Sequence, residues 1–397
     1  MNTANRLEGI GEYYFSKKLR EIEDLNRQGK NIISLGIGSP DQAPHPDVIK
    51  ILQDESGRSN THAYQSYKGS AVLRKAMASW YNQWYGVELN PEQEILPLAG
   101  SKEGIMHICM TYVNPGHLVL IPNPGYPTYQ SAAKLAGATL TTYELREENH
   151  WMPDFSEIKK SINAKGVDQD TVLMFVNYPQ MPTGQLPTKK LFEELVAFAK
   201  ENKVLLVHDN PYSFILNDEP LSILQVAGTD AQVIELNSLS KSHNMAGWRV
   251  GMMLANAEHV ENVLRFKSNM DSGMFLPVQL AAAKALSLPA SWYNEVNNLY
   301  RRRKQLVEQM LEGLGCHFSK TQAGLFVWAR VPDSLSDGYA MSDLLLYKAN
   351  VFITPGGIFG TAGNKYIRVS LCAPEEKILE CVNRLKQQGF IKPKQHV

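Results

Sequence analysis

Cysteine is scarce in this chain of 397 residues. The four cysteines are Cys109, Cys316, Cys372 and Cys381. They form no CxxC pair and no spacing with histidine that is typical of zinc sites, so neither a disulfide framework nor a bound metal is expected. Reduced, buried thiols are typical of a cytoplasmic protein, and we predict that localisation.

Long apolar runs and an excess of charge of either sign are also missing. Runs such as Val204–Val207 are far shorter than the roughly 20 residues that span a bilayer. The first 22 residues lack the apolar core of a signal peptide. Lys+Arg and Asp+Glu both number 40, which leaves no electrostatic footprint for nucleic acid or an anionic membrane. We therefore expect no nucleic-acid partner and no membrane partner.

The chain does contain short apolar runs that alternate with amphipathic stretches. We expect strands at residues 95–98, 117–121, 171–176, 203–208, 233–236 and 250–255, and helices at 102–113 and 188–201. Continuous apolar strands that alternate with helices indicate the α/β class, with a mostly parallel sheet covered on both faces.

The pattern changes after about residue 285. A long helix is expected at 290–314, followed by a strand at 324–331, a helix at 341–349 and a strand at 366–371. These elements predict a smaller α+β domain. The run Arg301–Arg303 on the long helix is interpreted as a solvated face, with a specific anion site as the alternative.

Ligands of open α/β sheets bind beyond the carboxyl ends of the strands, so the residues that follow each strand are candidates. Gly100, Ser101 and Lys102 open a helix and suit a phosphate, or they form a simple capped turn. Asp209 follows four apolar residues and needs a positive partner such as a protonated pyridine nitrogen, unless it caps the next helix.

Three basic residues complete the candidate chemistry. Lys241 follows a strand among small hydroxyl residues and, with a lowered pKa, could form a Schiff base, although an isolated lysine is usually a surface residue. Arg249 could bind a phosphate with its planar fork. Arg368 lies inside an apolar strand and could bind a carboxylate or form a structural ion pair.

Taken in order, these segments resemble the class I/II aminotransferases, which are pyridoxal-phosphate enzymes of fold type I. The most specific segment is SLSKSHNMAGWRVG at Ser238–Gly251. Three further segments look most like the LL-diaminopimelate aminotransferase-like branch: GIGSPD at 36–41, GSKEGI at 100–105 and NYPQMPTG at 177–184. The resemblance covers nearly the whole chain.

The resemblance implies a domain organisation and an assembly. Residues 1–44 would form an N-terminal arm that joins the small domain, 45–285 the large domain that binds pyridoxal 5'-phosphate, and 286–397 the small C-terminal domain. Tyr64 matches a tyrosine that reaches the phosphate from the partner subunit. A homodimer with shared active sites is therefore expected.

The resemblance also implies roles for single residues. Lys241 would form the Schiff base and later shuttle the proton, Asp209 would pair with the ring nitrogen, and Tyr212 would hydrogen-bond the ring hydroxyl. Tyr126 would stack on the ring. The residues expected to hold the phosphate are Ser101, Lys102, Ser238, Ser240 and Arg249, with Lys102 facing the substrate as the alternative. Arg368 would bind the substrate α-carboxylate, assisted by the backbone N–H of Gly38.

One position departs from the family pattern. Met181 stands where the family has an asparagine that donates to the ring hydroxyl, and methionine has no donor. Tyr212 alone, a redirected Gln180 or a water would then hold that oxygen. The loss of a donor is expected to raise the pKa of the Schiff base.

The function expected from the resemblance is amino transfer between an L-amino acid and a 2-oxo acid, with ping-pong kinetics. A lyase on the same fold, such as a carbon–sulfur β-lyase, is the alternative, and a binding protein on a decayed fold is a third hypothesis. The amino donor stays open among LL-diaminopimelate, aspartate, alanine, methionine and aromatic amino acids.

Overall fold

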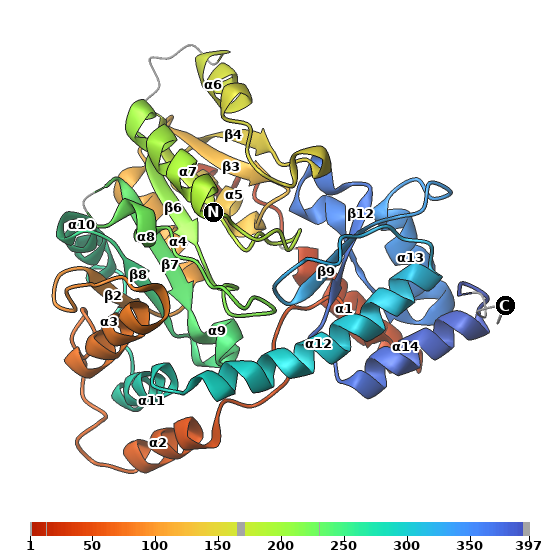
Figure 1. Cartoon of the computed structure of the whole chain (residues 1–397), viewed down its shortest axis with the longest axis horizontal. Coiled ribbons are helices and arrows are strands. Elements are labelled where there is room, and N and C mark those ends of the chain that lie inside the picture. The colour runs from red at the N-terminus through yellow and green to blue at the C-terminus, as the bar shows by residue number, and fades with distance from the viewer. Residues whose placement is uncertain (1, 13, 165–170, 230, 392–397) are drawn as a thin grey trace.

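A seven-stranded sheet forms the centre of the computed structural model, which describes residues 2–12, 14–164, 171–229 and 231–391 (Figure 1). The strands in chain order are β2 (Ile95–Leu98), β3 (Leu118–Asn123), β4 (Thr139–Glu144), β5 (Thr171–Val176), β6 (Leu205–Asp209), β7 (Val233–Ser238) and β8 (Gly251–Leu254). Their spatial order is β2-β8-β7-β6-β5-β3-β4. Within this described sheet only β8 runs antiparallel to its neighbours. The mostly parallel α/β sheet predicted from the sequence is therefore confirmed.

Alternate side chains of these strands enter two apolar cores, one on each face of the sheet. Val119 and Val207 pack with helices α4, α5 and α10. Leu120 and Leu206 belong to the other core, which includes α3, α7 and α11. The helices that accompany the sheet are α2 (Pro46–Ser56), α3 (Ala71–Tyr85), α4 (Ser101–Tyr112), α5 (Pro127–Leu135), α6 (Phe155–Ala164), α7 (Lys189–Asn202), α8 (Leu224–Ala227), α9 (Leu239–Ser242), α10 (Ala257–Lys267) and α11 (Leu276–Leu286).

A smaller antiparallel sheet lies beside the first, and its order is β11-β12-β9. Its strands are β9 (Phe326–Arg330), β11 (Thr354–Pro355) and β12 (Tyr366–Ser370), and β1 (Ile33–Ser34) pairs separately with β10 (Val351–Phe352). The helices here are α1 (Tyr14–Arg27), α13 (Gly338–Ala349) and α14 (Glu375–Gln387). Helix α12 (Ala290–Gly313) runs from the large sheet to this region (Figure 1). The domain boundaries at residues 44 and 285 stay a prediction.

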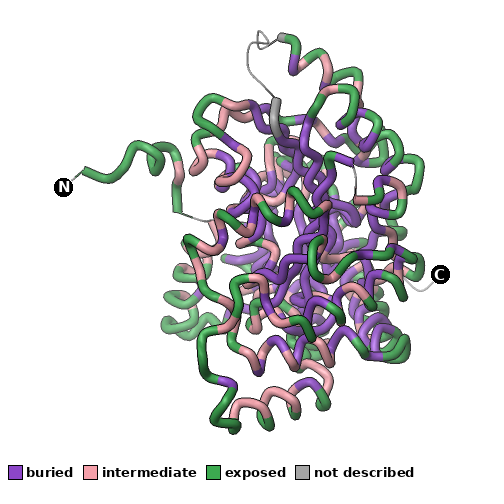
Figure 2. The backbone as a smooth tube through the Cα atoms, turned by 90° about the vertical axis from the view of Figure 1, so that its left-hand side faces the viewer, coloured by how far each residue is buried: buried purple, intermediate pink, exposed green. Residues whose placement is uncertain are grey.

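Short 3-10 helices complete the described elements. They lie at Asn5–Leu7, Glu147–Asn149, Ala246–Trp248, Gly356–Phe359 and Thr361–Gly363. Figure 2 shows the buried residues concentrated in the body of the molecule, while the N-terminal residues extend away from it. In the described ranges, no helix is both long enough and apolar enough to cross a membrane.

The structure corrects the interpretation of the run Arg301–Arg303. The side chains of Arg301 and Arg302 are solvated as expected. Arg303 is only 2% exposed, and its two terminal nitrogens donate to the Asp41 carboxylate at 2.7 and 2.8 Å. Burial of Asp41 opposes ionisation, but the hydrogen bonds and charge of Arg303 outweigh it and hold the pKa of Asp41 below its ordinary value. This bidentate pair ties α12 to the segment that follows Gly38.

Candidate active site

A cavity of about 540 Å³ lies where the carboxyl ends of the parallel strands face the smaller sheet. The structure brings together around it all of the predicted site residues except Tyr64. These residues are Gly38, Ser101, Lys102, Tyr126, Asp209, Tyr212, Ser238, Ser240, Lys241, Arg249 and Arg368. Tyr64 does not line the cavity and is 93% exposed in the single chain.

One end of the cavity is built for an anion. Helix α4 starts at Ser101 and directs its first backbone N–H groups toward this end. Ser238 and Ser240 place their hydroxyl groups 2.8 Å apart beside it. Arg249 brings its guanidinium close to Gly100, where a Cβ atom would lie 2.1 Å from Nη2. Gly100 also has a φ of 93°, a backbone conformation that favours glycine. Hydroxyls, backbone donors and a guanidinium suit a phosphate group.

A partly buried cluster of ionisable side chains supports the first turn of α4, and no motif in the sequence pointed to it. Glu103 accepts a hydrogen bond from the backbone N–H of Ala99 at 2.7 Å. The second oxygen of Glu103 lies 3.7 Å from Nε2 of the fully buried His107, and Asp271 lies 3.9 Å from the same nitrogen. Lys267 neutralises Asp271 at 2.7 Å. The cluster links α4 to the end of α10 and so helps to fix the anion-binding turn.

Asp209 lies at the carboxyl end of β6, at the bottom of the cavity. Its Oδ2 accepts a hydrogen bond from the Tyr129 hydroxyl at 2.8 Å, whereas Oδ1 is buried with no hydrogen-bond partner among the described residues. Burial raises the pKa of Asp209 to about 6, and the Tyr129 hydrogen bond, His208 and Lys241 oppose that shift. A buried carboxylate with one open oxygen matches a cationic ring nitrogen of a ligand in the cavity.

Lys241 in α9 points its amine into the cavity and donates a hydrogen bond to the Gly38 carbonyl at 2.6 Å. Burial lowers the pKa of this amine below its ordinary value, and the nearby Arg368 and Arg249 act in the same direction. A lysine with a lowered pKa reaches the neutral form that attacks a carbonyl. A Cβ atom at Gly38 would lie 2.1 Å from the Phe326 ring, so only glycine fits there.

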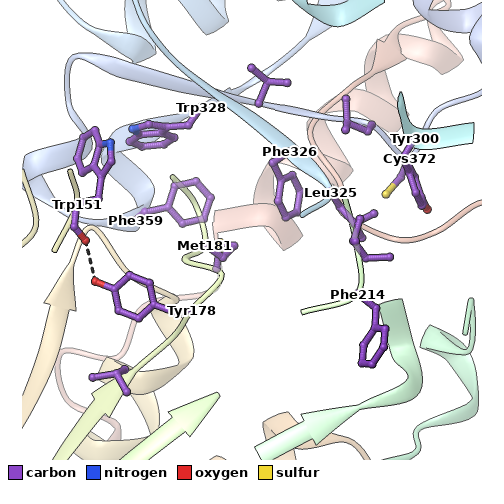
Figure 3. Close-up of a cluster of buried hydrophobic side chains, with 14 of the residues drawn as sticks. Trp151, Tyr178, Met181, Phe214, Tyr300, Leu325, Phe326, Trp328, Phe359 and Cys372 are labelled. Atoms are coloured by element: carbon purple, nitrogen blue, oxygen red, sulfur yellow. Dashed lines mark hydrogen bonds between the residues drawn. The ribbon is translucent and has the colours of Figure 1, made fainter. Parts of the chain in front are cut away.

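Arg368 projects from β12 into the cavity on the side of the smaller sheet. Its terminal nitrogens donate to the Gly36 carbonyl at 2.9 Å and to the Met181 thioether at 3.3 Å. The guanidinium lies over the ring of Phe326 at 3.8 Å and that of Phe359 at 4.5 Å. Figure 3 shows these two rings and Met181 in the same apolar cluster. These contacts orient the planar guanidinium at the wall of the cavity. A guanidinium placed in this way suits the carboxylate of a small ligand.

Met181 occupies the position at which the sequence departs from the family pattern. Its backbone N–H donates to Oδ1 of Asn177 at 2.7 Å, and the Asn177 amide donates to the Asp209 carbonyl at 2.5 Å. The Met181 thioether faces Arg368, which donates to it at 3.3 Å. Tyr212 also lines the cavity, and burial raises the pKa of its phenol well above the ordinary value, so the phenol can donate a hydrogen bond. Tyr126 lines the cavity with its ring edge-on to Tyr129.

Sequence reasoning missed several cavity residues with identifiable contacts, among them Phe15, Tyr129 and Asn177. Asn177 directly follows β5. Because ligands bind beyond the carboxyl ends of the strands, its position in the sequence could have marked it as a candidate. Tyr129 lies three residues after Tyr126, almost one turn further along α5. Phe15 gave no local signal because its contact with Arg368, at 5.7 Å from the ring, joins opposite ends of the chain.

Comparisons with known proteins show which sequences the chain is similar to. Residues 30–385 match the sequence profile of "Aminotransferase class I and II". The LL-diaminopimelate aminotransferase of Halothermothrix orenii is 37% identical over 98% of this chain and 99% of its own length. That of Desulforudis audaxviator is 40% identical over 96% of this chain and 97% of its own length.

The chain is also similar in fold to solved structures. BacF from Bacillus subtilis is 32% identical and superposes with a TM-score of 0.92 over 99% of both chains. An aromatic aminotransferase from Pyrococcus horikoshii is 30% identical, with a TM-score of 0.84 over 93% of this chain and 100% of its own.

Proposed function

This chain belongs to the aminotransferase class I and II family, and from that premise we propose that its cavity moves an amino group between an L-α-amino acid and a 2-oxo acid. The protein is a pyridoxal-phosphate-dependent aminotransferase of fold type I. One observation carries the assignment of the site: the Lys241 amine, the open oxygen of Asp209 and the Arg368 fork line one cavity.

The residues present fit pyridoxal phosphate at both of its polar ends. Ser101, Ser238, Ser240 and Arg249 would hold the phosphate, with Lys102 beside them. The open oxygen of Asp209 would accept the proton of the ring nitrogen. When bound, the cofactor forms a Schiff base with an amine and withdraws electrons from the neighbouring carbon, which eases removal of the α-proton.

Two aromatic residues would complete the cofactor site. Tyr126 would lie against the ring face, because it lines the cavity and directly precedes α5. Tyr212 would donate to the ring oxygen, since burial keeps its phenol protonated. With Met181 in place of a donor, Tyr212 is the hydroxyl of this chain assigned to that oxygen.

Lys241 would perform both covalent attachment and proton transfer. Burial lowers the pKa of its amine, which favours the neutral form as nucleophile and as general base at Cα. Arg368 would bind the α-carboxylate and so present the Cα–H bond to Lys241. Orientation of this kind can supply roughly 7–11 kcal/mol of a barrier. The phosphate site needs no change between the two half-reactions, so the kinetics would be ping-pong.

We further propose a homodimer in which Tyr64 reaches the phosphate of the partner's site. Tyr64 is 93% exposed. Other exposed large apolar side chains lie on the segments 64–72 and 270–275, namely Tyr67, Val72, Met270 and Phe275. Gln65 pairs with Gly273, which brings these segments together. An apolar patch of this kind is typical of a protein interface.

The domain division and the compartment also belong to the proposal. The large domain would span residues 45–285, and the arm 1–44 would join residues 286–397 in the small domain, as the pairing of β1 with β10 supports. All four cysteines are free and buried, which suits the cytoplasm.

The lyase alternative is not favoured, because the relatives and the matching structural neighbours include named aminotransferases. Product analysis tests the proposal. Purified protein supplied with pyridoxal phosphate, an amino acid and 2-oxoglutarate should yield glutamate and the 2-oxo acid of the donor. Release of ammonia with pyruvate, and no glutamate, would support the lyase instead.

The names of the relatives supply candidate donors. LL-diaminopimelate is the donor indicated by the curated relatives, and an aromatic amino acid is indicated by the Pyrococcus horikoshii structure. These two donors differ most at the distal end of the side chain, where the first is charged and the second is apolar.

A further inference from the structure

One wall of the cavity carries only apolar side chains. It consists of Phe15 and Leu19 from α1 and of Ile37 from the segment after β1. Leu19 is 37% exposed and Ile37 is 36% exposed. Both side chains therefore present apolar surface to the solvent that fills the cavity. Exposed apolar side chains at a cavity wall indicate a surface that an apolar group covers.

This wall, hereafter the apolar wall, starts beside the reacting groups. The Phe15 ring lies 5.7 Å from the Arg368 guanidinium. Ile37 directly precedes Gly38, whose carbonyl lies 2.6 Å from the Lys241 amine. The wall therefore begins between the proposed carboxylate anchor and the proposed base.

The four substituents of a substrate Cα can be assigned to these groups. On the proposed function, the carboxylate faces Arg368, and the amino group and the α-hydrogen face Lys241. The fourth substituent, the side chain, then extends along the apolar wall.

Charged groups at the cavity are all accounted for by other roles. Among the described residues that line it, the charged ones are Lys102, Asp209, Lys241, Arg249 and Arg368. The proposed function assigns these residues to the phosphate, the ring nitrogen, the reacting amine and the α-carboxylate. Among the described residues of this chain, a second charged group on the substrate would find no counter-charge at the apolar wall and would lose hydration there.

We propose that the amino donor has an apolar side chain, of the class of leucine, methionine and phenylalanine, and that Phe15, Leu19 and Ile37 select it. This inference rests on the proposed function and assigns its substrate class. It separates this chain from the donor named for its curated relatives, because LL-diaminopimelate carries a charged amino-acid group at its distal end.

A donor panel tests the substrate class. The holoenzyme is assayed with 2-oxoglutarate as acceptor and with leucine, methionine, phenylalanine, alanine, aspartate and LL-diaminopimelate as donors. We expect kcat/KM for at least one of the three apolar donors to exceed the values for aspartate and LL-diaminopimelate by about tenfold or more. A higher kcat/KM for LL-diaminopimelate or aspartate would overturn the inference and leave the proposed function standing. No transfer from any donor would overturn both.

A pair of variants tests the residues. Leu19→Asn places an amide on the apolar wall, and Leu379→Asn makes the same change at a leucine of α14 that is 46% exposed and does not line the cavity. We expect Leu19→Asn to lower the ratio of kcat/KM for leucine to that for alanine by about tenfold, because the alanine side chain is too short to use the wall. Leu379→Asn should leave this ratio unchanged. An unchanged ratio in Leu19→Asn would overturn the assignment of the wall.

Binding without turnover gives an independent readout. Calorimetry compares 4-methylpentanoate, which has the leucine skeleton without the amino group, with glutarate, which carries a second carboxylate. Tighter binding of 4-methylpentanoate to the holoenzyme, weakened in Leu19→Asn and kept in Leu379→Asn, is the expected result. Tighter binding of glutarate would contradict the proposal.

Discussion

The Asp209 carboxylate links the stability of the protein to the binding of its cofactor. Because burial raises its pKa from 3.8 to about 6, the unfolded chain loses this proton at lower pH than the folded chain does. Without a cationic partner, the contribution of Asp209 to stability is therefore greatest below pH 4 and is lost as the pH rises toward about 6. A shift of this size corresponds to about 3 kcal/mol.

Asp209→Asn should consequently stabilise the protein without cofactor at pH 8, by up to about 3 kcal/mol, and have little effect at pH 4. The amide oxygen can still accept the hydrogen bond from Tyr129. Urea unfolding of the apoprotein at both pH values measures the difference. Equal destabilisation at both would show that Asp209 is held by interactions other than the expected cationic ligand.

Met181 offers a test of the departure from the family pattern. Its thioether contacts Arg368 at 3.3 Å and supplies no donor. In Met181→Asn, an added donor beside the ring oxygen should lower the pKa at which the visible absorption band of the holoenzyme changes. Met181→Leu, which adds no donor, is the matched control. If asparagine and leucine give the same spectral pKa, Met181 does not lie where the family resemblance places it.

Single residues differ in how far the sequence could reveal them. Lys241, Asp209 and Arg368 stood out because a charged group beside or within an apolar strand needs a partner. Tyr129 carried no such signal, and Asn177 was marked only by its place after a predicted strand, because a neutral side chain needs no charged partner. Their contacts with Asp209 join α5, the loop after β5 and β6, and only the folded chain brings these segments together.

Helix α12 connects the two sheets and is anchored by the pair between Arg303 and Asp41. The sequence predicted this helix within a residue of its ends but placed Arg303 on a solvated face. Its partner lies 262 residues away in the chain, so no local pattern could show that one arginine of three is buried. Strands β1, β10 and β11 were not predicted for a similar reason, because two residues are too few to show a periodicity.

Removing the buried guanidinium leaves Asp41 without its counter-charge. Because the Asp41 side chain stays partly open to water, at 20% exposure, Arg303→Met should reduce the free energy of unfolding by about 1.5–3 kcal/mol. Arg301→Met, on the same helix, removes an exposed pair with Asp218 and should cost about 1 kcal/mol or less. Denaturant unfolding of the two variants at pH 7 makes the comparison. Similar losses would show that the Arg303 pair adds no more than a surface pair.

The continuous apolar strands explain why six of the seven strands of the large sheet were predicted, whereas the edge strand β4, with the polar sequence TLTTYE, was missed. Their burial on both faces leaves a signal in each strand that does not depend on distant partners. The assembly is different, because the exposed Tyr64 makes no contact within one chain that would reveal its role.

Mixing two inactive variants tests the proposed dimer. Lys241→Ala and Tyr64→Ala each damage every site of their own homodimer. In a mixed dimer, one site has Lys241 in one subunit and Tyr64 from the other. Refolding the two variants together should restore activity that neither shows alone. If mixed dimers form by mass measurement and activity stays absent, Tyr64 does not act across subunits.

The visible absorption spectrum of the purified protein with pyridoxal phosphate tests the central role of Lys241 most directly. The wild type should show a visible band that disappears on addition of an apolar amino acid and returns on addition of 2-oxoglutarate. Lys241→Ala should bind the cofactor without forming that band. An unchanged visible band in Lys241→Ala, or no band in the wild type, would contradict the assignment of Lys241 as the residue that carries the reaction.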